Sequence, residues 1–176
     1  MGTRSITSLI LSFLLYLILQ IFLFNSWYMI LFNYGFCFVY LATILLLPFE
    51  TSLITLLLVA FGVGFVVDNF TNTLGMHTAA SVLMAYARPL IIRLLMPQRG
   101  YEERLSLNLK SMGPQWFISY IGLCLLVHHT LLFTLEASSW SLILPGMLKI
   151  ILSIFYTGFV IFIIQYFLSP KRTEIS

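Results

Sequence analysis

Long apolar runs, broken only by short polar turns, constrain this chain more than any other feature of its sequence. Each run is about as long as the roughly 20 residues that a helix needs to cross the hydrocarbon core of a bilayer. Apolar residues make up 60% of the chain and charged residues only 9%, against about 25% charged residues in soluble domains. So few polar residues cannot cover a soluble core. The sequence therefore predicts a protein whose solvent is a lipid bilayer.

Six of these runs are present, and we expect each to form a transmembrane helix. They do not alternate with period two, which argues against the strands of a membrane barrel. The prediction is an all-α, polytopic membrane protein with a single domain over residues 1–176. Its helices are expected over residues 6–24, 29–47, 51–67, 75–96, 115–135 and 143–168.

The distribution of Lys and Arg predicts the orientation. With an even number of spans, both termini and the 97–114 loop share one side, and Lys149 lies on the other. Cytoplasmic loops are enriched in Lys and Arg, so both termini are expected in the cytoplasm. The residues on the cytoplasmic side are Arg4, Arg88, Arg93, Arg99, Arg104, Lys110, Lys171 and Arg172.

The loop over residues 97–114 contains apolar side chains at helical spacing, with charged residues between them. Tyr101, Leu105, Leu109 and Met112 follow one another by four, four and three residues. This pattern predicts a short amphipathic helix. It could lie on the cytoplasmic leaflet or against a partner, and a loop without fixed structure is the third alternative.

Small residues mark places where transmembrane helices can approach closely. They occur four apart as Ala60 and Gly64, as Ser81 and Ala85, and as Ser153 and Thr157. The third and fourth helices are therefore expected to pack tightly together. The first two helices carry bulkier side chains and are expected to face lipid or another protein.

Ionisable groups inside a membrane are costly, so each one is a candidate functional residue. The candidates are Asp68, His77, His128, His129 and Glu136. We expect Asp68, His77 and Glu136 near the outer surface, in contact with water. The histidines could be neutral and hydrogen-bonded between helices, or could serve a proton relay.

A metal site or a catalytic site is the less favoured interpretation of these groups. A metal site would need His77, His129, Asp68 and Glu136 to converge, and the i,i+4 zinc spacing is absent. Asp68 and Glu136 could form an outer carboxylate pair, but Asp68 is more simply explained as a helix-end residue in a polar turn. Gly75 suits the tight entry into the next helix. We expect no metal, no cofactor and no catalytic residue.

Arg88 and Pro89 lie near the cytoplasmic end of the fourth predicted helix. Proline removes a backbone donor and kinks a helix. The long side chain of Arg88 is expected to extend to the lipid headgroups and anchor the helix there, with contact to a partner as the alternative.

The stretch from Leu47 to Leu95 resembles the bacterial rod shape-determining protein family MreD. Segment 126–137 is similar to the Bacteroidetes branch of that family. Many relatives carry Gly where this chain has Asn72, and Asn tolerates the same left-handed turn. The residues that carry the resemblance are Pro48, Gly62, Gly64, Asp68, Thr71, Leu74, Gly75, His77, Ala79, Ala80, Tyr86, Arg88 and Pro89.

The resemblance implies a non-enzymatic scaffold of the inner membrane that acts in peptidoglycan synthesis and maintains rod shape. Its implied partners are a single-span MreC-like protein, the MreB filaments, RodA, a penicillin-binding transpeptidase and membrane lipids. A net charge of +3, held at membrane edges, does not indicate a nucleic-acid binder. The family is also similar in fold to the S-components of energy-coupling-factor transporters. A substrate-binding transporter subunit is therefore the alternative function.

Overall fold

The computed structural model describes residues 6–24, 30–97, 107–137 and 143–169, and within these ranges the chain is helical and contains no strand. The prediction of an all-α protein is thus confirmed. The helices are α1 (Ile6–Leu19), its π-helical continuation η1 (Gln20–Phe24), the short 3₁₀ helix η3 (Val39–Leu41), α2 (Ala42–Leu45), α3 (Leu53–Thr71), α4 (Met76–Leu94), α5 (Leu109–Met112), α6 (Pro114–Glu136) and α7 (Ile143–Leu168).

Three of the described helices are long and apolar enough to cross a membrane by length and composition. They are α3, α6 and the Gly146–Leu168 part of α7. A shorter apolar helical stretch covers Leu11–Leu23. These helices are the basis on which the chain is treated below as a membrane protein.

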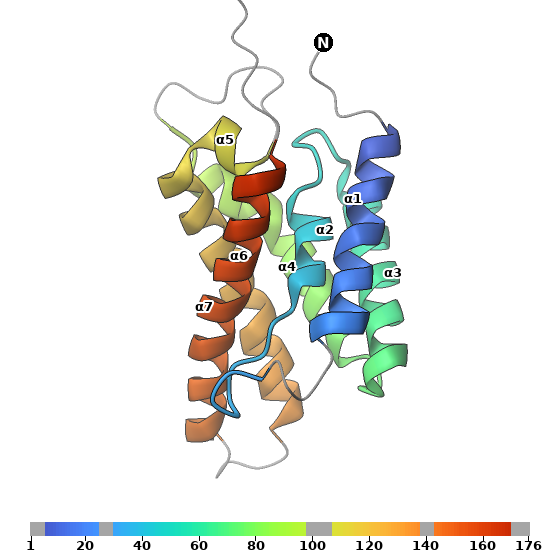
Figure 1. Cartoon of the computed structure of the whole chain (residues 1–176), viewed down its shortest axis with the longest axis vertical. Coiled ribbons are helices and arrows are strands. Elements are labelled where there is room, and N and C mark those ends of the chain that lie inside the picture. Colours follow the sequence, from blue (N-terminus) through green and yellow to red (C-terminus); the bar gives the residue numbers. More distant parts are fainter. Residues whose placement is uncertain (1–5, 25–29, 98–106, 138–142, 170–176) are drawn as a thin grey trace, which may run out of the picture.

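The long helices form a row in which α3 packs on α4, α4 on α6 and α6 on α7. In Figure 1, α1 and α3 run downwards, α4 runs upwards, α6 downwards and α7 upwards. The α3–α4 turn and the end of α6 thus lie at the lower end of the view, which we call the turn end. The opposite end carries α5, and we call it the α5 end.

The predicted helix over residues 29–47 is wrong. Residues 30–47, which we call the irregular segment, begin with a tight turn in which Leu31 and Gly35 exchange two backbone hydrogen bonds of 2.8 and 2.7 Å. Residues 36–38 follow without helical structure, and only then come η3 and α2. The segment still leads from the turn end towards the α5 end, as the blue-to-cyan chain of Figure 1 shows.

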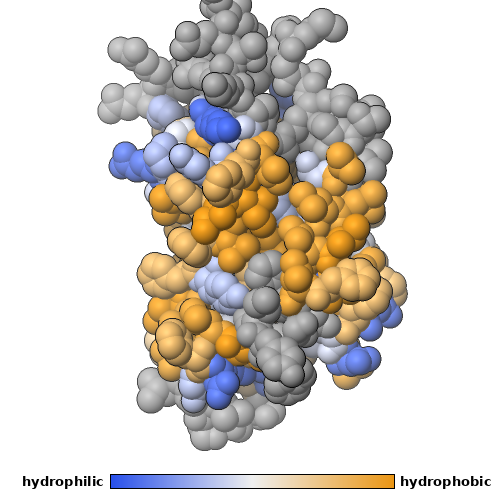
Figure 2. All heavy atoms as spheres, in the orientation of Figure 1, coloured by the Kyte–Doolittle hydropathy of each residue, from blue (hydrophilic) through white to orange (hydrophobic). Residues whose placement is uncertain are grey.

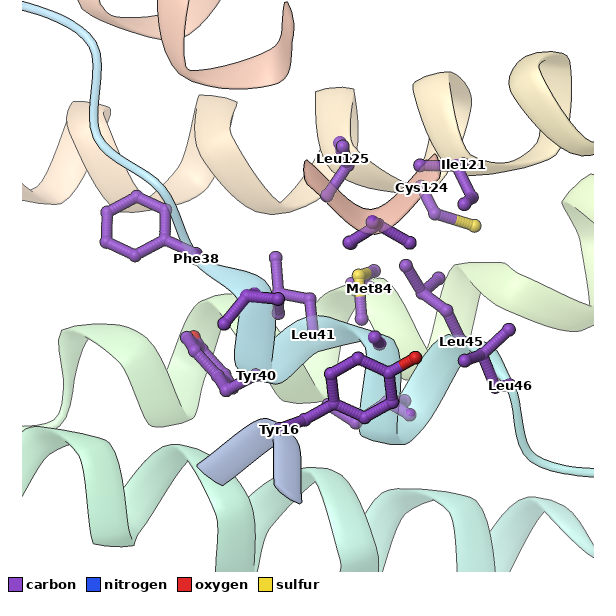
Figure 3. Packing of buried hydrophobic residues seen from close by; sticks show 14 of the residues in the cluster. Tyr16, Phe38, Tyr40, Leu41, Leu45, Leu46, Met84, Ile121, Cys124 and Leu125 are labelled. Atoms are coloured by element: carbon purple, nitrogen blue, oxygen red, sulfur yellow. The ribbon is translucent and has the colours of Figure 1, made fainter. Parts of the chain in front are cut away.

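The burial of the irregular segment explains why its sequence resembles that of a transmembrane helix. Val39, Tyr40, Leu41, Ala42, Ile44 and Leu45 are each 0% exposed. Figure 3 shows this stretch packed among Tyr16, Met84 and Leu125 from three different helices. The apolar residues from Cys37 to Leu46 therefore contact protein, and for them the expectation that they face lipid or a partner is wrong, whereas Phe32 in the preceding turn is 78% exposed. A continuous apolar run does not by itself distinguish a helix from a buried extended segment.

Local sequence signals explain both ends of α3 and the start of α4. Helix α3 begins after Ser52, whose hydroxyl accepts a hydrogen bond from Thr55 N at 3.2 Å, as an N-cap serine does. It ends at Asn72, which has the left-handed conformation (φ 56°) that its side chain tolerates. Helix α4 then begins at Gly75, whose φ of 92° favours glycine. Both predicted roles, for Asn72 and for Gly75, agree with this geometry.

The predicted amphipathic helix lies largely outside the described residues. The part that is described contains α5, a single turn capped by Asn108, whose Oδ1 accepts from Ser111 N at 2.8 Å. Leu107 and Leu109 are buried, and α5 contacts both α6 and α7. This turn therefore packs on the end of the helix row.

The outside of the bundle is apolar, and a set of polar side chains is buried among the apolar side chains of its core. Figure 2 shows an apolar surface across the middle of one face, with hydrophilic residues towards its ends. Phe155 is 74% exposed, whereas Arg88 is 1% exposed. Other large apolar side chains on the outer surface are Leu11, Phe22, Ile54, Leu58, Phe65, Leu90, Ile118, Phe159 and Phe167.

Candidate functional site

Asp68 lies at the turn end, in the last turn of α3, and joins this helix to the start of α4. Its Oδ1 accepts from His77 N at 3.0 Å and from the Thr73 hydroxyl at 2.6 Å. Its Oδ2 accepts from Thr78 N at 2.9 Å and from the Thr78 hydroxyl at 2.5 Å. Gly75, at the N-cap of α4, has no side chain to satisfy the first backbone N–H groups of that helix. The carboxylate of Asp68 therefore performs the capping from the preceding helix.

This arrangement corrects the expectation that Asp68 and His77 lie at a wet surface. Asp68 is 6% exposed and His77 is 4% exposed. A carboxylate can be buried there because four donors point at it and because helix N-termini favour negative charge. Asp68 is a helix-end residue, as predicted, but it works inside the protein.

Close packing of α3 on α4 keeps the two helices in register for this contact. A Cβ atom on Gly64 would lie 2.5 Å from Thr78 Cα and 2.9 Å from Thr78 N. Ala60 on the same face of α3 is 0% exposed. The predicted tight contact between these helices is thus present, and Gly64 is the residue that permits it.

A second polar group lies deeper in the bundle, and we call it the Tyr40 cluster: Tyr40, His77, Ser81 and His128. The Tyr40 hydroxyl lies 3.1 Å from His77 Nδ1, 3.2 Å from Ser81 Oγ and 2.9 Å from His128 Nε2. Tyr40 belongs to the irregular segment, His77 and Ser81 to α4, and His128 to α6. One phenol thus links three elements that are distant in sequence.

The hydrogen-bond partners indicate which ring nitrogens carry protons. His129 Nδ1 lies 2.8 Å from the Leu125 carbonyl, which only accepts, so this nitrogen is the donor. In the Tyr40 cluster, every pairing is satisfied if His128 Nε2 and Ser81 donate to Tyr40 and Tyr40 donates to His77 Nδ1, or if the roles of the two histidines are exchanged. We adopt the first assignment, because the second would leave a buried N–H group of His128 without an acceptor. This assignment leaves a lone pair, and not an N–H, on His128 Nδ1, the buried side-chain atom that has no hydrogen-bond partner among the described residues.

Side chains from neighbouring helices satisfy the backbone of the irregular segment. The Ser153 hydroxyl of α7 accepts from Phe36 N at 2.9 Å, and Thr157 Oγ1 accepts from Phe38 N at 3.0 Å. Gln20 of η1 donates to the Cys37 carbonyl at 3.2 Å and accepts from Tyr40 N at 3.4 Å. Non-helical backbone in a membrane protein needs such partners, because lipid offers none. The predicted small-residue pair Ser153 and Thr157 therefore serves mainly as hydrogen-bonding groups.

Arg88 is buried, and the prediction that it extends to the lipid headgroups is wrong. Its Nε donates to the Tyr120 hydroxyl at 2.8 Å, and its Nη2 donates to the Leu47 carbonyl. Tyr120 in turn donates to the Leu45 carbonyl at 2.9 Å. These carbonyls follow the C-terminus of α2, where helices favour a positive charge. Arg88 thus fixes the exit of the irregular segment, while Pro89 lies within α4 without ending it.

Glu136 lies at the exposed end of α6 and pairs with a residue of α7. Lys149 Nζ donates to Glu136 Oε1 at 2.6 Å. The same ammonium lies 5.6 Å from the Phe36 ring centroid and 5.7 Å from the Phe133 centroid. Lys149 therefore covers an aromatic group that continues inwards through Phe38.

The structure brings some predicted site residues together and separates others. Asp68 and His77 meet at the cap, and Thr71 joins it through Thr73, with 2.7 Å between their hydroxyl oxygens. Leu74 projects outwards and is 100% exposed. His129 faces Thr157, at 3.4 Å, while Glu136 faces Lys149. In the described part of the chain, no three His, Cys, Asp or Glu side chains are grouped so that they could hold a metal ion.

Sequence reasoning missed Tyr40, Tyr120 and Gln20, which organise the interior, and it assigned Ser81 only to close helix packing. Each lies inside an apolar run and is uncharged, so no charge signal marked it. Isolated polar residues at the centre of predicted spans were the available signal, since such groups need buried partners.

Comparisons of the chain with protein-family models, with curated proteins and with solved structures find no match.

Proposed function

We propose that this protein is a non-enzymatic scaffold of the bacterial inner membrane that supports cell elongation and peptidoglycan synthesis. The observation that carries the proposal is that the buried polar groups are bonded to other parts of the chain, while the exterior is apolar. Buried polar groups such as Asp68, Arg88 and Tyr40 bond the chain's own backbone and side chains. Such an interior supports a role in holding a fixed shape within a bilayer. The sequence resemblance to the MreD family supplies the process and the partners.

The proposed partner is a single-span MreC-like protein that docks on α1. The irregular segment is largely buried, which leaves α1 as the accessible part of the two elements first expected to contact partners. Leu11 and Ile18 of α1 are 70% and 52% exposed, and Phe22 of η1 is 74% exposed, so α1 and its continuation present apolar side chains outwards. In lipid, association depends on close packing and not on the hydrophobic effect. Enlarged side chains on the correct face should therefore disrupt it.

The proposal is tested by depleting the native protein in a rod-shaped host that carries it and supplying variants. Wild type should restore rods, and the Leu11→Trp/Ile18→Trp variant should leave rounded cells that contain normal amounts of inserted protein. Phe155→Trp, on the exposed face of α7, is the matched control and should restore rods. Unchanged cell shape on clean depletion would refute the elongation role. Copurification of the single-span partner with the α1 variant would refute the docking face.

The second candidate is a substrate-binding subunit of a transporter, and the irregular segment is the observation that favours it. Interrupted backbone inside a membrane bundle is typical of transporter binding sites, where it contacts substrate. Native mass spectrometry of the protein released from mild detergent would reveal a tightly bound small molecule. A retained ligand together with normal cell shape on depletion would favour this candidate over the scaffold.

A further inference from the structure

We propose that His128 Nδ1 is the proton-accepting atom of a buried site that controls the position of residues 36–40. This inference is independent of the scaffold function. It begins with the unpartnered Nδ1 of His128, a side chain that is 0% exposed. Buried polar atoms in folded proteins are nearly always paired, so an unpaired basic lone pair needs an explanation. An imidazole is the side chain whose ordinary protonation range lies near neutral pH.

The rings packed around His128 disfavour a proton on its Nδ1 atom, and such a proton would in turn disfavour this packed arrangement. Its ring centroid lies 5.2 Å from that of His129, 5.9 Å from Phe38, 6.0 Å from Tyr40 and 6.3 Å from His77. A proton on Nδ1 would add a positive charge and an N–H donor within these rings. Neither would have a partner in the closed arrangement, and both are costly to bury. Admission of water next to His128 would relieve this cost.

The element best placed to move is the stretch of residues 36–40. Figure 3 shows Phe38 on the extended part of the chain just before η3. The Phe38 ring centroid lies 5.0 to 5.9 Å from those of all three histidines. Side-chain hydroxyl groups and the Gln20 amide hold this backbone, and residues 36–38, before η3, belong to no helix or sheet. Its displacement breaks a few side-chain bonds and leaves α4, α6 and α7 intact.

Aromatic residues separate the Tyr40 cluster from the turn end. Phe36 and Phe38 are stacked with centroids 6.3 Å apart, and Phe133 lies 6.2 Å from Phe38. Lys149 covers Phe36 and Phe133 at the exposed end. When residues 36–40 shift, water from the turn end delivers a proton to the Nδ1 lone pair, and the Nε2 proton stays on the ring.

Other titratable groups set the limits of this response. Facing His128 are Tyr40 from the irregular segment, His77 from α4 and His129 from its own helix. Asp68 of α3 contacts the cluster through the backbone of His77. Glu136 lies eight residues after His128 on α6, and its charge is neutralised by Lys149 of α7. One positive charge among three adjacent imidazoles disfavours a second, so the site takes a single proton.

The test is hydrogen–deuterium exchange of the full chain in lipid nanodiscs, between about pH 8 and about pH 5, a range that brackets the ordinary histidine pKa of about 6.5. After correction for the pH dependence of intrinsic exchange, protection of residues 36–40 should fall about tenfold on acidification, which is the signature of a local opening. Protection of α3 should not change. Constant protection of residues 36–40 across this range would overturn the proposal.

Two variants identify the responsible ring. His128→Gln keeps a donor near the position of Nε2 and has no titratable group, so protection should become independent of pH. His129→Asn keeps a donor near the position of Nδ1 and should respond as wild type does. A response that persists in His128→Gln, or that disappears only in His129→Asn, would overturn the assignment.

A measurement on unaltered protein keeps the proposal testable if His128→Gln does not fold. Nitrogen NMR of histidine-labelled wild type in nanodiscs should show His128 protonated at Nε2 at high pH. After acidification this form should exchange with a minor form that is protonated at both nitrogens, while His129 remains protonated at Nδ1 alone. Loss of protection at residues 36–40 without any such exchange at His128 would refute the site.

Discussion

At the scale of single residues, Asp68 has the largest predicted effect on stability. In Asp68→Asn, an amide group replaces one carboxylate oxygen, so two of its four donors lose their acceptor. Hydrogen bonds to charged groups contribute about 1.5–3 kcal/mol each, so we expect a loss of at least about 2 kcal/mol. Thermal unfolding in detergent, followed by circular dichroism, measures the change. The control is Asn69→Ala, which removes an exposed hydrogen bond to Phe65 O and should change the Tm little. Equal Tm values for Asp68→Asn and Asn69→Ala would contradict the capping role.

Gly64 and Gly62 form a matched pair on one helix. In Gly64→Ala the new methyl group meets the backbone of Thr78, which cannot move without separating α3 from α4. Overpacking of this kind costs about 1–3 kcal/mol. Gly62→Ala meets nothing within 4 Å and should be neutral or stabilise α3 by up to about 1 kcal/mol. The fraction of protein that stays monodisperse after heating should therefore fall for Gly64→Ala alone, and a similar loss in both variants would contradict close packing.

The residues that local chemistry governs could be predicted from the sequence. Asn72, Gly75 and the helix-end role of Asp68 follow from turn propensities and capping needs, which involve neighbours in the chain. Tyr40 and Arg88 could not be placed in this way, because their partners lie far away in sequence. Arg88 in particular satisfied the rule for a headgroup anchor, yet the free carbonyls after α2 offered it a buried alternative.

At the scale of elements, the irregular segment depends on hydroxyl groups of α7. Thr157→Val keeps the shape of the side chain but leaves the buried Phe38 N–H without its acceptor. An unsatisfied buried donor costs about 1–3 kcal/mol. The expected result is a lower Tm together with faster exchange at residues 36–40. Thr134→Val is the control, because that exposed hydroxyl bonds only the Thr130 carbonyl of its own helix; a Thr157→Val protein as stable as this control would contradict the bonding scheme.

Hydrophobic pattern alone could not have predicted this segment. The run over residues 29–47 is apolar, as α3 is. An apolar run can be buried in lipid or in protein, and its sequence does not distinguish the two. Gly35 and the Asn33 turn signal lay inside the run. The first and last runs contain polar residues, Gln20 and Thr157, which are the hydrogen-bond partners that a non-helical neighbour requires. Polar residues inside other apolar runs are thus the sequence signal for such a segment.

At the scale of the whole molecule, buried polar groups lie within an apolar core, and large apolar side chains also cover the outside. In water this outer surface would be a wide exposed apolar area. In a bilayer, burial of apolar surface contributes little to association between helices, so close packing and hydrogen bonds must hold the bundle together. The Gly64 contact, the Asp68 cap and the Tyr40 cluster supply both.

The orientation of the whole bundle gives the last prediction. If both termini lie in the cytoplasm, as the distribution of Lys and Arg predicts, the turn end faces outwards and the α5 end faces inwards. Leu74 is 100% exposed at the turn end, and Glu50 is exposed between the irregular segment and α3. The natural Cys37 and Cys124 are buried and should not react with a charged maleimide that cannot cross the inner membrane. Leu74→Cys should therefore be labelled in intact cells, and Glu50→Cys only after permeabilisation. Labelling in the reverse order would show that the topology is inverted, and labelling of both in intact cells would contradict an α3 that crosses the membrane.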